Sequence, residues 1–269
     1  MKLVHTSDIH LDMCFAAYRM PPGFGSRRRQ GLKDVFRAIV QRAGNWPADA
    51  LVIAGDLFDL DRVNRDTVGL LLHEFRSIPH VPIFIAPGPS DPFTPLSPYS
   101  TESWPKNVTI FRRPEWESVP LKDGAFVVHG FGYDRREPGT NPFGTLTIPE
   151  TDRGRIHVAV GHGTERNHQT PDRPMCLPFE IQNALPKGLD YLALGHQHQT
   201  TQIEGELDAA AWYSGAPEGH NLRESGMHAY LEVEIEKGRV NVAQIPSSRV
   251  VYSTHRIECT ELHGAQDLV

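Results

Sequence analysis

The chain has 269 residues, of which 39% are hydrophobic and 22% charged, a composition typical of a globular protein with one sizeable core. The formal net charge is −6 at pH 7 and the pI is near 6.1, so no overall basic field favours nucleic acid. Bound divalent cations would add positive charge that this count omits, and DNA therefore stays open as a partner. No apolar run reaches membrane-spanning length, so we expect no membrane partner.

The cysteines indicate the compartment. Cys14, Cys176 and Cys259 are far apart in the sequence and show no Cys-x-x-Cys spacing, which suggests neither a disulfide framework nor a thiolate zinc site. Residues 1–5 run directly into a polar motif and do not resemble a signal peptide. We therefore expect a cytoplasmic protein with reduced thiols.

The first 86 residues alternate between predicted strands and helices. Residues 2–6, 50–54 and 81–86 are short runs that predict buried strands. Apolar residues recur at helical spacing over 32–40 and 68–75, which predicts two helices with one apolar stripe each. The resulting βαβαβ order favours parallel strands with helices packed on the sheet.

The rest of the chain predicts further strands separated by long loops. The strand-like segments are 108–111, 117–121, 125–129, 155–160, 191–194, 209–213, 229–235 and 239–245, of which the last two form a hairpin. The loops 132–151 and 164–178 are long and polar, which is typical of functional or mobile segments. The simplest division is one domain over residues 1–245 and a C-terminal tail over 246–269.

Five polar segments lie directly after predicted strands. They are Asp8-Ile9-His10, Gly55-Asp56-Leu57-Phe58-Asp59, Gly88-Pro89-Ser90-Asp91, Gly161-His162-Gly163 and Gly195-His196-Gln197-His198. Open α/β sheets bind ligands beyond the carboxyl ends of their strands, where these segments are placed. Asp8 and His10 are two residues apart, as are His196 and His198. In an extended chain each pair would therefore point its side chains to one side.

The side chains of these segments indicate a metal centre. The candidate ligands are two carboxylates and four imidazoles: Asp8, His10, Asp56, His162, His196 and His198. This set exceeds the needs of one ion, and mixed oxygen and nitrogen donors suit Mn, Fe, Zn or Co better than Mg or Ca. Two ions about 4 Å apart that share a carboxylate can hold a phosphoryl group and supply a nucleophile at neutral pH. One such segment alone would be a weak signal, but four in this order indicate a site.

The order of the segments resembles the calcineurin-like metallophosphoesterase superfamily. Within it, residues 5–12, 54–59 and 213–218 are similar to SbcD-type DNA repair exonucleases, and the resemblance covers roughly residues 1–250. It implies an α/β fold arranged as a four-layer α/β/β/α sandwich. It also implies two divalent metal ions, with Mn favoured and Fe or Zn as alternatives.

The resemblance also implies which residues hold the ions. One ion would be held by Asp8, His10, Asp56 and His198, and the other by Asp56, His162, His196 and an asparagine. DNA and an SbcC-like ATPase would be partners, and a homodimer is a further expectation. Such nucleases carry a capping domain after the core, so residues 246–269 are either a tail or the start of a capping region.

The third segment departs from the family pattern, which has Gly-Asn-His-Asp at this place. Pro89 stands where the asparagine ligand is expected and offers neither a side-chain donor atom nor a backbone N–H. Ser90 replaces the histidine, and a hydroxyl is a poor proton donor near neutral pH compared with an imidazole. We therefore expect the second ion to bind more weakly. The catalytic candidates are Asp56, His162, Ser90 and Asp91.

Another group could take over the missing function. Asp91, His168 and His220 are candidates, although the two histidines lie on polar loops, where bystander histidines at the surface are common. Asp12 and Asp59 are expected to orient the ligands. His5 and His129 lie in or next to apolar strands and are expected to be core residues.

We therefore predict a metal-dependent phosphodiesterase that resembles SbcD-type exonucleases, with activity reduced by the altered segment. The first alternative is a metal-binding pseudo-nuclease that serves as a regulatory or assembly subunit, which Pro89 and Ser90 favour. The second alternative is a small-molecule phosphodiesterase, which the acidic net charge favours.

Overall fold

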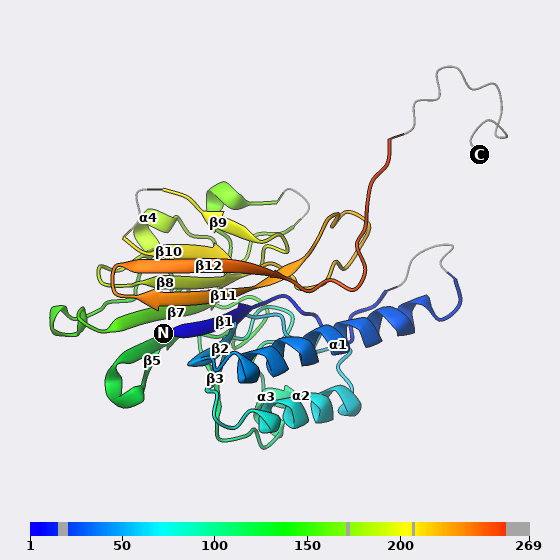
Figure 1. The fold of residues 1–269 in the computed structure, drawn as a ribbon, viewed down its shortest axis with the longest axis horizontal. Helices are drawn as coiled ribbons and strands as arrows, with labels where there is room; N and C mark the ends of the chain where they lie inside the picture. Colours follow the sequence, from blue (N-terminus) through cyan, green and yellow to red (C-terminus); the bar gives the residue numbers. More distant parts are fainter. Residues whose placement is uncertain (16–20, 171–172, 206–207, 257–269) are drawn as a thin grey trace.

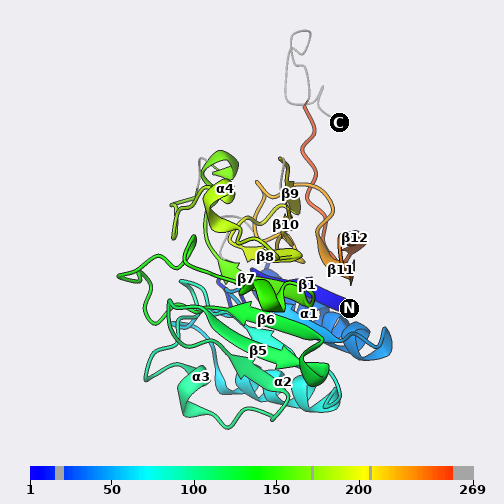
Figure 2. The same cartoon turned by 90° about the vertical axis from the view of Figure 1, so that its left-hand side faces the viewer.

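Two six-stranded sheets stack face to face in the computed structural model, which describes residues 1–15, 21–170, 173–205 and 208–256 (Figures 1 and 2). The first sheet has the order β12-β11-β1-β2-β3-β4 and the second β5-β6-β7-β8-β10-β9. The strands of the first sheet are β1 (Lys2–Thr6), β2 (Ala50–Ile53), β3 (Ile83–Ile85), β4 (Val108–Ile110), β11 (Ala229–Glu236) and β12 (Arg239–Pro246). Those of the second are β5 (Glu117–Leu121), β6 (Phe126–Gly130), β7 (Ile156–His162), β8 (Tyr191–Gly195), β9 (Thr201–Ile203) and β10 (Ala210–Tyr213).

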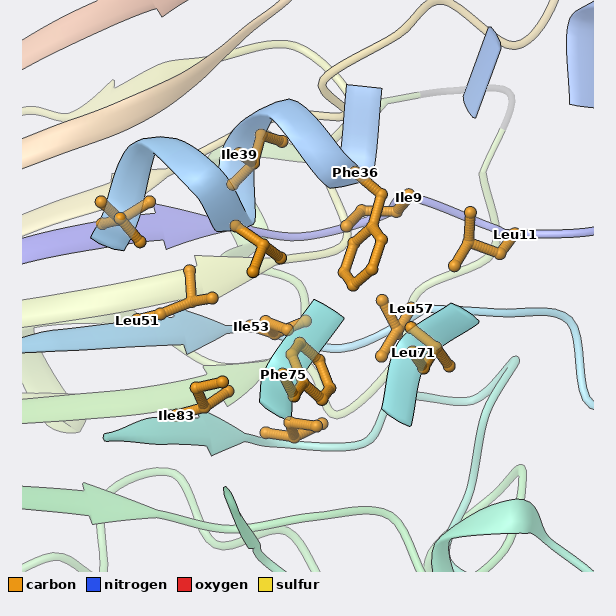
Figure 3. Close-up of a cluster of buried hydrophobic side chains, with 14 of the residues drawn as sticks. Ile9, Leu11, Phe36, Ile39, Leu51, Ile53, Leu57, Leu71, Phe75 and Ile83 are labelled. Carbon is orange, nitrogen blue, oxygen red and sulfur yellow. The ribbon is translucent and has the colours of Figure 1, made fainter. Parts of the chain in front are cut away.

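Helices pack on the outer face of the first sheet. They are α1 (Phe24–Asn45) and α2 (Arg65–Ser77), with the short α3 (Pro98–Thr101) in the same layer. The short α4 (Ile181–Ala184) packs on the second sheet, and 3-10 turns occur at Lys122–Gly124, Glu150–Asp152 and Arg166–His168. The apolar stripe of α1 presents Phe36 and Ile39 to Leu51 and Ile53 of β2, and Phe75 of α2 joins the same cluster (Figure 3). Its members are almost fully buried, so the hydrophobic effect fixes both helices on this face.

A second core fills the space between the sheets. Val52 and Phe84 of the first sheet belong to one buried cluster with Val128, Val158 and Tyr191 of the second. Strands β1, β2, β3 and β4 are parallel, as are β6, β7, β8 and β10. Most of these strands are covered on both faces and are apolar nearly throughout, as in other buried parallel sheets, whereas β4 lies at an edge of its sheet and is only partly buried.

Loop residues and α4 cover the outer face of the second sheet. Phe179 and Ile181 pack there against Leu192 and Ala211, and Phe143 stacks on Phe179 with ring centroids 3.9 Å apart. The four-layer sandwich predicted from the sequence is therefore confirmed, and its fourth layer consists largely of loop. Within the described residues, no helix is both long and apolar enough to cross a membrane.

The strands expected from the sequence are present, with differences at the ends. Helix α1 begins at Phe24, eight residues before the predicted stripe, because its first turns are polar and carry no apolar periodicity. The strand β9 was missed, since three residues are too few for a pattern. Residues after β12 still contact the body, because the backbone N–H of Arg249 donates to Glu218. The division at residue 245 stays a prediction.

Candidate metal centre

The polar residues that follow β1, β2 and β8 lie close together with the last residue of β7, and two of their imidazoles approach the Asp56 carboxylate. Asp56 Oδ2 lies 3.4 Å from His10 Nε2 and 3.8 Å from His162 Nε2. A third imidazole approaches the other candidate carboxylate, with His198 Nε2 3.7 Å from Asp8 Oδ1. Asp56 is therefore placed between two imidazoles from opposite sheets, as a carboxylate shared by two ions would be.

These side chains converge through left-handed backbone and not through extended chain. The φ angles of Asp8, His10, Asp56 and His196 are 51°, 49°, 52° and 112°. The expectation that Asp8 and His10 align because they are two apart in a strand is therefore wrong, since β1 ends at Thr6. Positive φ is unfavourable for residues with a Cβ by about 1 kcal/mol or more each, and such strain gathers at functional sites.

Each of three imidazoles is oriented by a hydrogen bond from Nδ1. His10 Nδ1 donates to Asp59 Oδ1 at 2.8 Å, and His162 Nδ1 donates to the Ala54 carbonyl at 2.9 Å. His198 Nδ1 donates to Glu224 Oε1 at 2.9 Å. These bonds fix the tautomer and direct the three Nε2 atoms into the centre, as is usual for metal-binding histidines.

Asp59 thus has the orienting contact that the sequence indicated. Asp12 instead lies beside Lys33 and accepts from the backbone N–H of Asn64 at 3.0 Å. Glu224 was not foreseen, because nothing in its sequence neighbourhood marks it as a partner of His198.

Several buried polar atoms of the centre have no hydrogen-bond partner. Among the described residues these include Asp8 Oδ1, His162 Nε2, His196 Nε2, His198 Nε2 and both ring nitrogens of His220. An unsatisfied buried polar atom costs about 1–3 kcal/mol, so such a concentration is unfavourable without a ligand. Metal ions fit these atoms, since all of them are nitrogen or oxygen donors that face one another.

In the part of the chain that the structure describes, three groups of side chains are close enough to hold an ion. They are Asp8, His10 and Asp56; His10, His198 and His220; and His162, Cys176 and His196. Within each group the ligand atoms lie within 4.8 Å of one another. The sequence-predicted ligands are thus brought together. Beside them lie His220, which the sequence offered as a candidate to take over the missing function, and Cys176, which was not foreseen.

His220 differs from its expectation. It was a candidate to replace the missing group, although its polar loop favoured a surface bystander. It is buried, with ring centroids 5.2 Å from His10 and 4.7 Å from His198. His168 instead bonds Glu165 at 2.9 Å and belongs to none of the three groups. A polar loop can fold back over a site, which residue polarity alone does not reveal.

The expected core histidines are satisfied in the interior. His5 bonds the Tyr191 hydroxyl at 2.9 Å, and burial lowers its pKa to about 3. His129 bonds Ser118 at 2.8 Å and His157 at 2.9 Å.

The Gly88–Asp91 segment supports the Asp56 carboxylate. The Ser90 backbone N–H donates to Asp56 Oδ1 at 2.8 Å, and the Ser90 hydroxyl donates to Asp56 Oδ2 at 3.0 Å. Gly88 is needed at this approach, because a Cβ there would lie 2.5 Å from Asp56 Oδ1. Ser90 thus lies on the carboxylate at the middle of the centre.

Asp91 is fully buried and accepts four hydrogen bonds. Its Oδ1 accepts from the backbone N–H groups of Asp56 (3.0 Å) and Gly88 (2.7 Å). Its Oδ2 accepts from the Leu57 N–H (2.9 Å) and the Tyr99 hydroxyl (2.7 Å). These contacts join the loop after β2 to the loop after β3, and they give Asp91 a positioning role.

Burial and charge act in opposite directions on the ionisable groups. Burial lowers the pKa of His10, but the hydrogen bond to Asp59 and the surrounding carboxylates raise it to about 9. Burial also opposes the charge on His162, whose pKa the Asp56 carboxylate nevertheless raises. Burial lowers the pKa of His198 and of His220, which keeps both neutral and able to bind a cation.

Comparison with known proteins identifies the family. The family model for calcineurin-like phosphoesterases matches residues 1–200. This chain belongs to the calcineurin-like phosphoesterase family. An uncharacterized metallophosphoesterase, YhaO of Bacillus subtilis (strain 168), is 26% identical over 272 residues, with 97% of this chain covered. The chain spans 64% of the length of that relative.

Solved structures of low identity share the fold of this calcineurin-like phosphoesterase. A dimetal phosphatase from Danio rerio matches with a TM-score of 0.56 and 12% identity, covering 92% of this chain and 99% of that one. The protein TT1561 of Thermus thermophilus matches with a TM-score of 0.53 and 14% identity, covering 90% of this chain and 98% of that one.

A pocket of about 800 Å³ opens beside the centre of this phosphoesterase. His198, His220 and Arg173 are among the residues that line it. Apolar side chains, among them Phe15 and Phe24, line it as well. The lining therefore combines a cation and site histidines with apolar surface.

Proposed function

We propose that this protein is a metal-dependent phosphodiesterase that uses two divalent ions. The observation that carries the proposal is a group of buried nitrogen and oxygen donors at the strand ends: two imidazoles lie next to Asp56 Oδ2, and several other donor atoms of the centre have no hydrogen-bond partner. The similarity to a dimetal phosphatase supports two ions in place of one. Mn stays the favoured ion for the position with mixed oxygen and nitrogen donors, with Fe or Zn as alternatives.

The residues divide between the two ions. Asp8, His10, Asp56 and His198 would hold the first ion, and Asp56, His162 and His196 the second. Two such ions would polarise a phosphoryl group and supply a nucleophile at neutral pH.

Other residues of the chain keep these donors in place. Asp59 and Glu224 hold His10 and His198 in the tautomer that leaves Nε2 free. Ser90 holds Asp56 through two hydrogen bonds, which limits the movement of the shared carboxylate. The cationic Arg173, 3.1 Å from Glu224, is placed to attract an anionic substrate to the pocket.

The proposed substrate is a phosphodiester, with DNA as the favoured class. The similarity of residues 5–12 and 54–59 to SbcD-type nucleases supports DNA as the substrate. The pocket beside His198 and His220 supports it too, because its volume can hold a nucleoside next to a phosphate. The apolar side chains that line the same pocket also support a small organic phosphodiester. An SbcC-like ATPase partner and a homodimer remain predictions, for which co-purification and light scattering are the measurements.

A pseudo-nuclease is the second candidate function. Its support is Ser90, whose hydroxyl is bonded to Asp56 at 3.0 Å and offers no imidazole to protonate a leaving oxygen. Such a protein would bind metal and a partner without turnover.

The test combines metal content with hydrolysis. Chelated protein is reloaded with Mn²⁺ or Zn²⁺, and bis-p-nitrophenyl phosphate, end-labelled single-stranded DNA and a phosphomonoester are offered in parallel. We expect metal-dependent cleavage of a phosphodiester, which Asp56→Asn abolishes. The control Asp66→Asn makes the same change on the exposed first turn of α2 and should leave activity unchanged. Bound metal without cleavage of any substrate would support the pseudo-nuclease.

A further inference from the structure

Cys176 lies where the second ion is expected, although it is far from the ligand motifs in sequence. Its Sγ lies 3.3 Å from His196 Nδ1, and the ligand atoms of Cys176, His162 and His196 lie within 4.8 Å of one another. Both imidazoles are buried, and each has an Nε2 atom without a hydrogen-bond partner. Histidine nitrogen and cysteine sulfur are both established ligands of Zn²⁺, and here they face one another in the interior.

The loop that carries Cys176 is attached to the chain just after His162. The Thr164 backbone N–H donates to the Cys176 carbonyl at 2.8 Å, and the Cys176 N–H donates to the Thr164 hydroxyl at 3.0 Å. Leu177, next in the chain, is buried with Phe131 and Tyr133. The hydrogen bonds to Thr164 and the apolar packing of Leu177 therefore both hold the Cys176 thiol against the centre.

The position has also lost a ligand that Cys176 could replace. Pro89 stands where the family's asparagine is expected and has no donor atom, so the second ion keeps only Asp56, His162 and His196. One thiolate would complete four donors around this ion, the usual number for Zn²⁺. The thiol would release its proton to solvent when the metal binds. The resulting thiolate carries a negative charge, which the neutral asparagine amide does not.

We propose that Cys176 is a ligand of the second ion in place of the missing asparagine, and that it makes this position select a thiophilic ion such as Zn²⁺ over Mn²⁺. The inference rests on the proposed two-ion function. Soft sulfur donors favour Zn²⁺, whereas the first position has only oxygen and nitrogen donors. The two positions would then prefer different ions.

The test reads the coordination of the metal directly. Natural protein is loaded with Zn²⁺, and X-ray absorption at the zinc edge is compared with that of Cys176→Ser and of the matched control Cys14→Ser, which alters an exposed cysteine. We expect a sulfur neighbour at about 2.3 Å in the natural protein and in Cys14→Ser but not in Cys176→Ser. Cys176→Ser should also bind the second ion at least about tenfold more weakly, while the first ion is retained.

Metal content separates the two proposals. Two bound ions without any sulfur neighbour in the natural protein would overturn the role of Cys176 and leave the phosphodiesterase proposal standing. Failure of the natural protein to bind any ion would overturn both.

A second measurement needs no variant. Alkylation of the natural protein is followed by peptide mass spectrometry with and without Zn²⁺. We expect Zn²⁺ to slow labelling of Cys176 and to leave labelling of Cys14 unchanged. Equal labelling rates of Cys176 with and without two bound Zn²⁺ ions would contradict the inference.

Discussion

Asp91→Asn should separate the loop after β3 from the loop after β2 and so weaken the metal centre. The two residues have the same shape, but all four partners of Asp91 are placed as donors. An amide keeps one acceptor oxygen and turns an NH₂ group toward the other two donors. The Tyr99 hydroxyl can rotate and accept from this NH₂ group, but the Leu57 N–H cannot.

The size of the effect follows from these four bonds. The buried Leu57 N–H is left without an acceptor, which costs about 1–3 kcal/mol. The two bonds that remain lose their charge assistance, about 1 kcal/mol each. Part of this loss is offset, because burial and the charge of Asp56 raise the pKa of Asp91 to about 7 and so oppose its ionised form. We expect a net loss of about 2–4 kcal/mol in the free energy of unfolding.

Urea unfolding of chelated protein measures the stability, and titration of refolded protein with Mn²⁺ measures metal affinity. Tyr99→Phe is the matched control, because it deletes one hydrogen bond of Asp91 and leaves the three backbone bonds in place. Asp91→Asn should weaken metal binding about tenfold or more, whereas Tyr99→Phe should not. If Asp91→Asn kept natural stability and natural metal affinity, the hydrogen bonds of Asp91 would not hold the centre together.

Three further outcomes are expected. Asp56→Asn should remove both ions, whereas His162→Ala should mainly remove the second; full metal content of Asp56→Asn by elemental analysis would contradict a shared carboxylate. The double change Pro89→Asn with Ser90→His supplies an amide and a proton donor, so cleavage of a phosphodiester reporter should rise roughly tenfold or more. Equal and robust cleavage rates in the natural protein and in the double variant would show that the natural site is already competent. Burial, and to a smaller extent the neighbouring His157, lowers the pKa of His129 to about 4 in the folded protein. Between about pH 6.5 and pH 4 the unfolded state therefore binds more protons than the folded state, so the free energy of unfolding falls as the pH drops through this window. The loss at pH 5 relative to pH 8 is about 2 kcal/mol from this group, and His129→Gln should reduce that slope in thermal melts of the chelated protein.

Much of the fold follows from sequence patterns that act locally. Residues 50–53 can form little other than a buried strand, because the run is apolar and too short for a helix. The stripes of α1 and α2 lie at the spacing that buries one face of a helix, and both pack where that face is covered. The placement of Asp56 after one strand and of His196 after another likewise predicted a centre at the strand ends. Local periodicity and chain order carry this information.

The tertiary structure decided which donors face one another. Cys176 and His220 lie on polar loops with no periodic pattern. Cys176 reaches the centre because Leu177, its neighbour in the chain, packs with Phe131 and Tyr133. His220 reaches it by packing against the rings of His10 and His198. Left-handed backbone at Asp8 and His10 replaced the extended geometry expected from their spacing. Contacts between residues far apart in the chain depend on the whole folded molecule, because each is formed only when both sheets and the loops between them are in place.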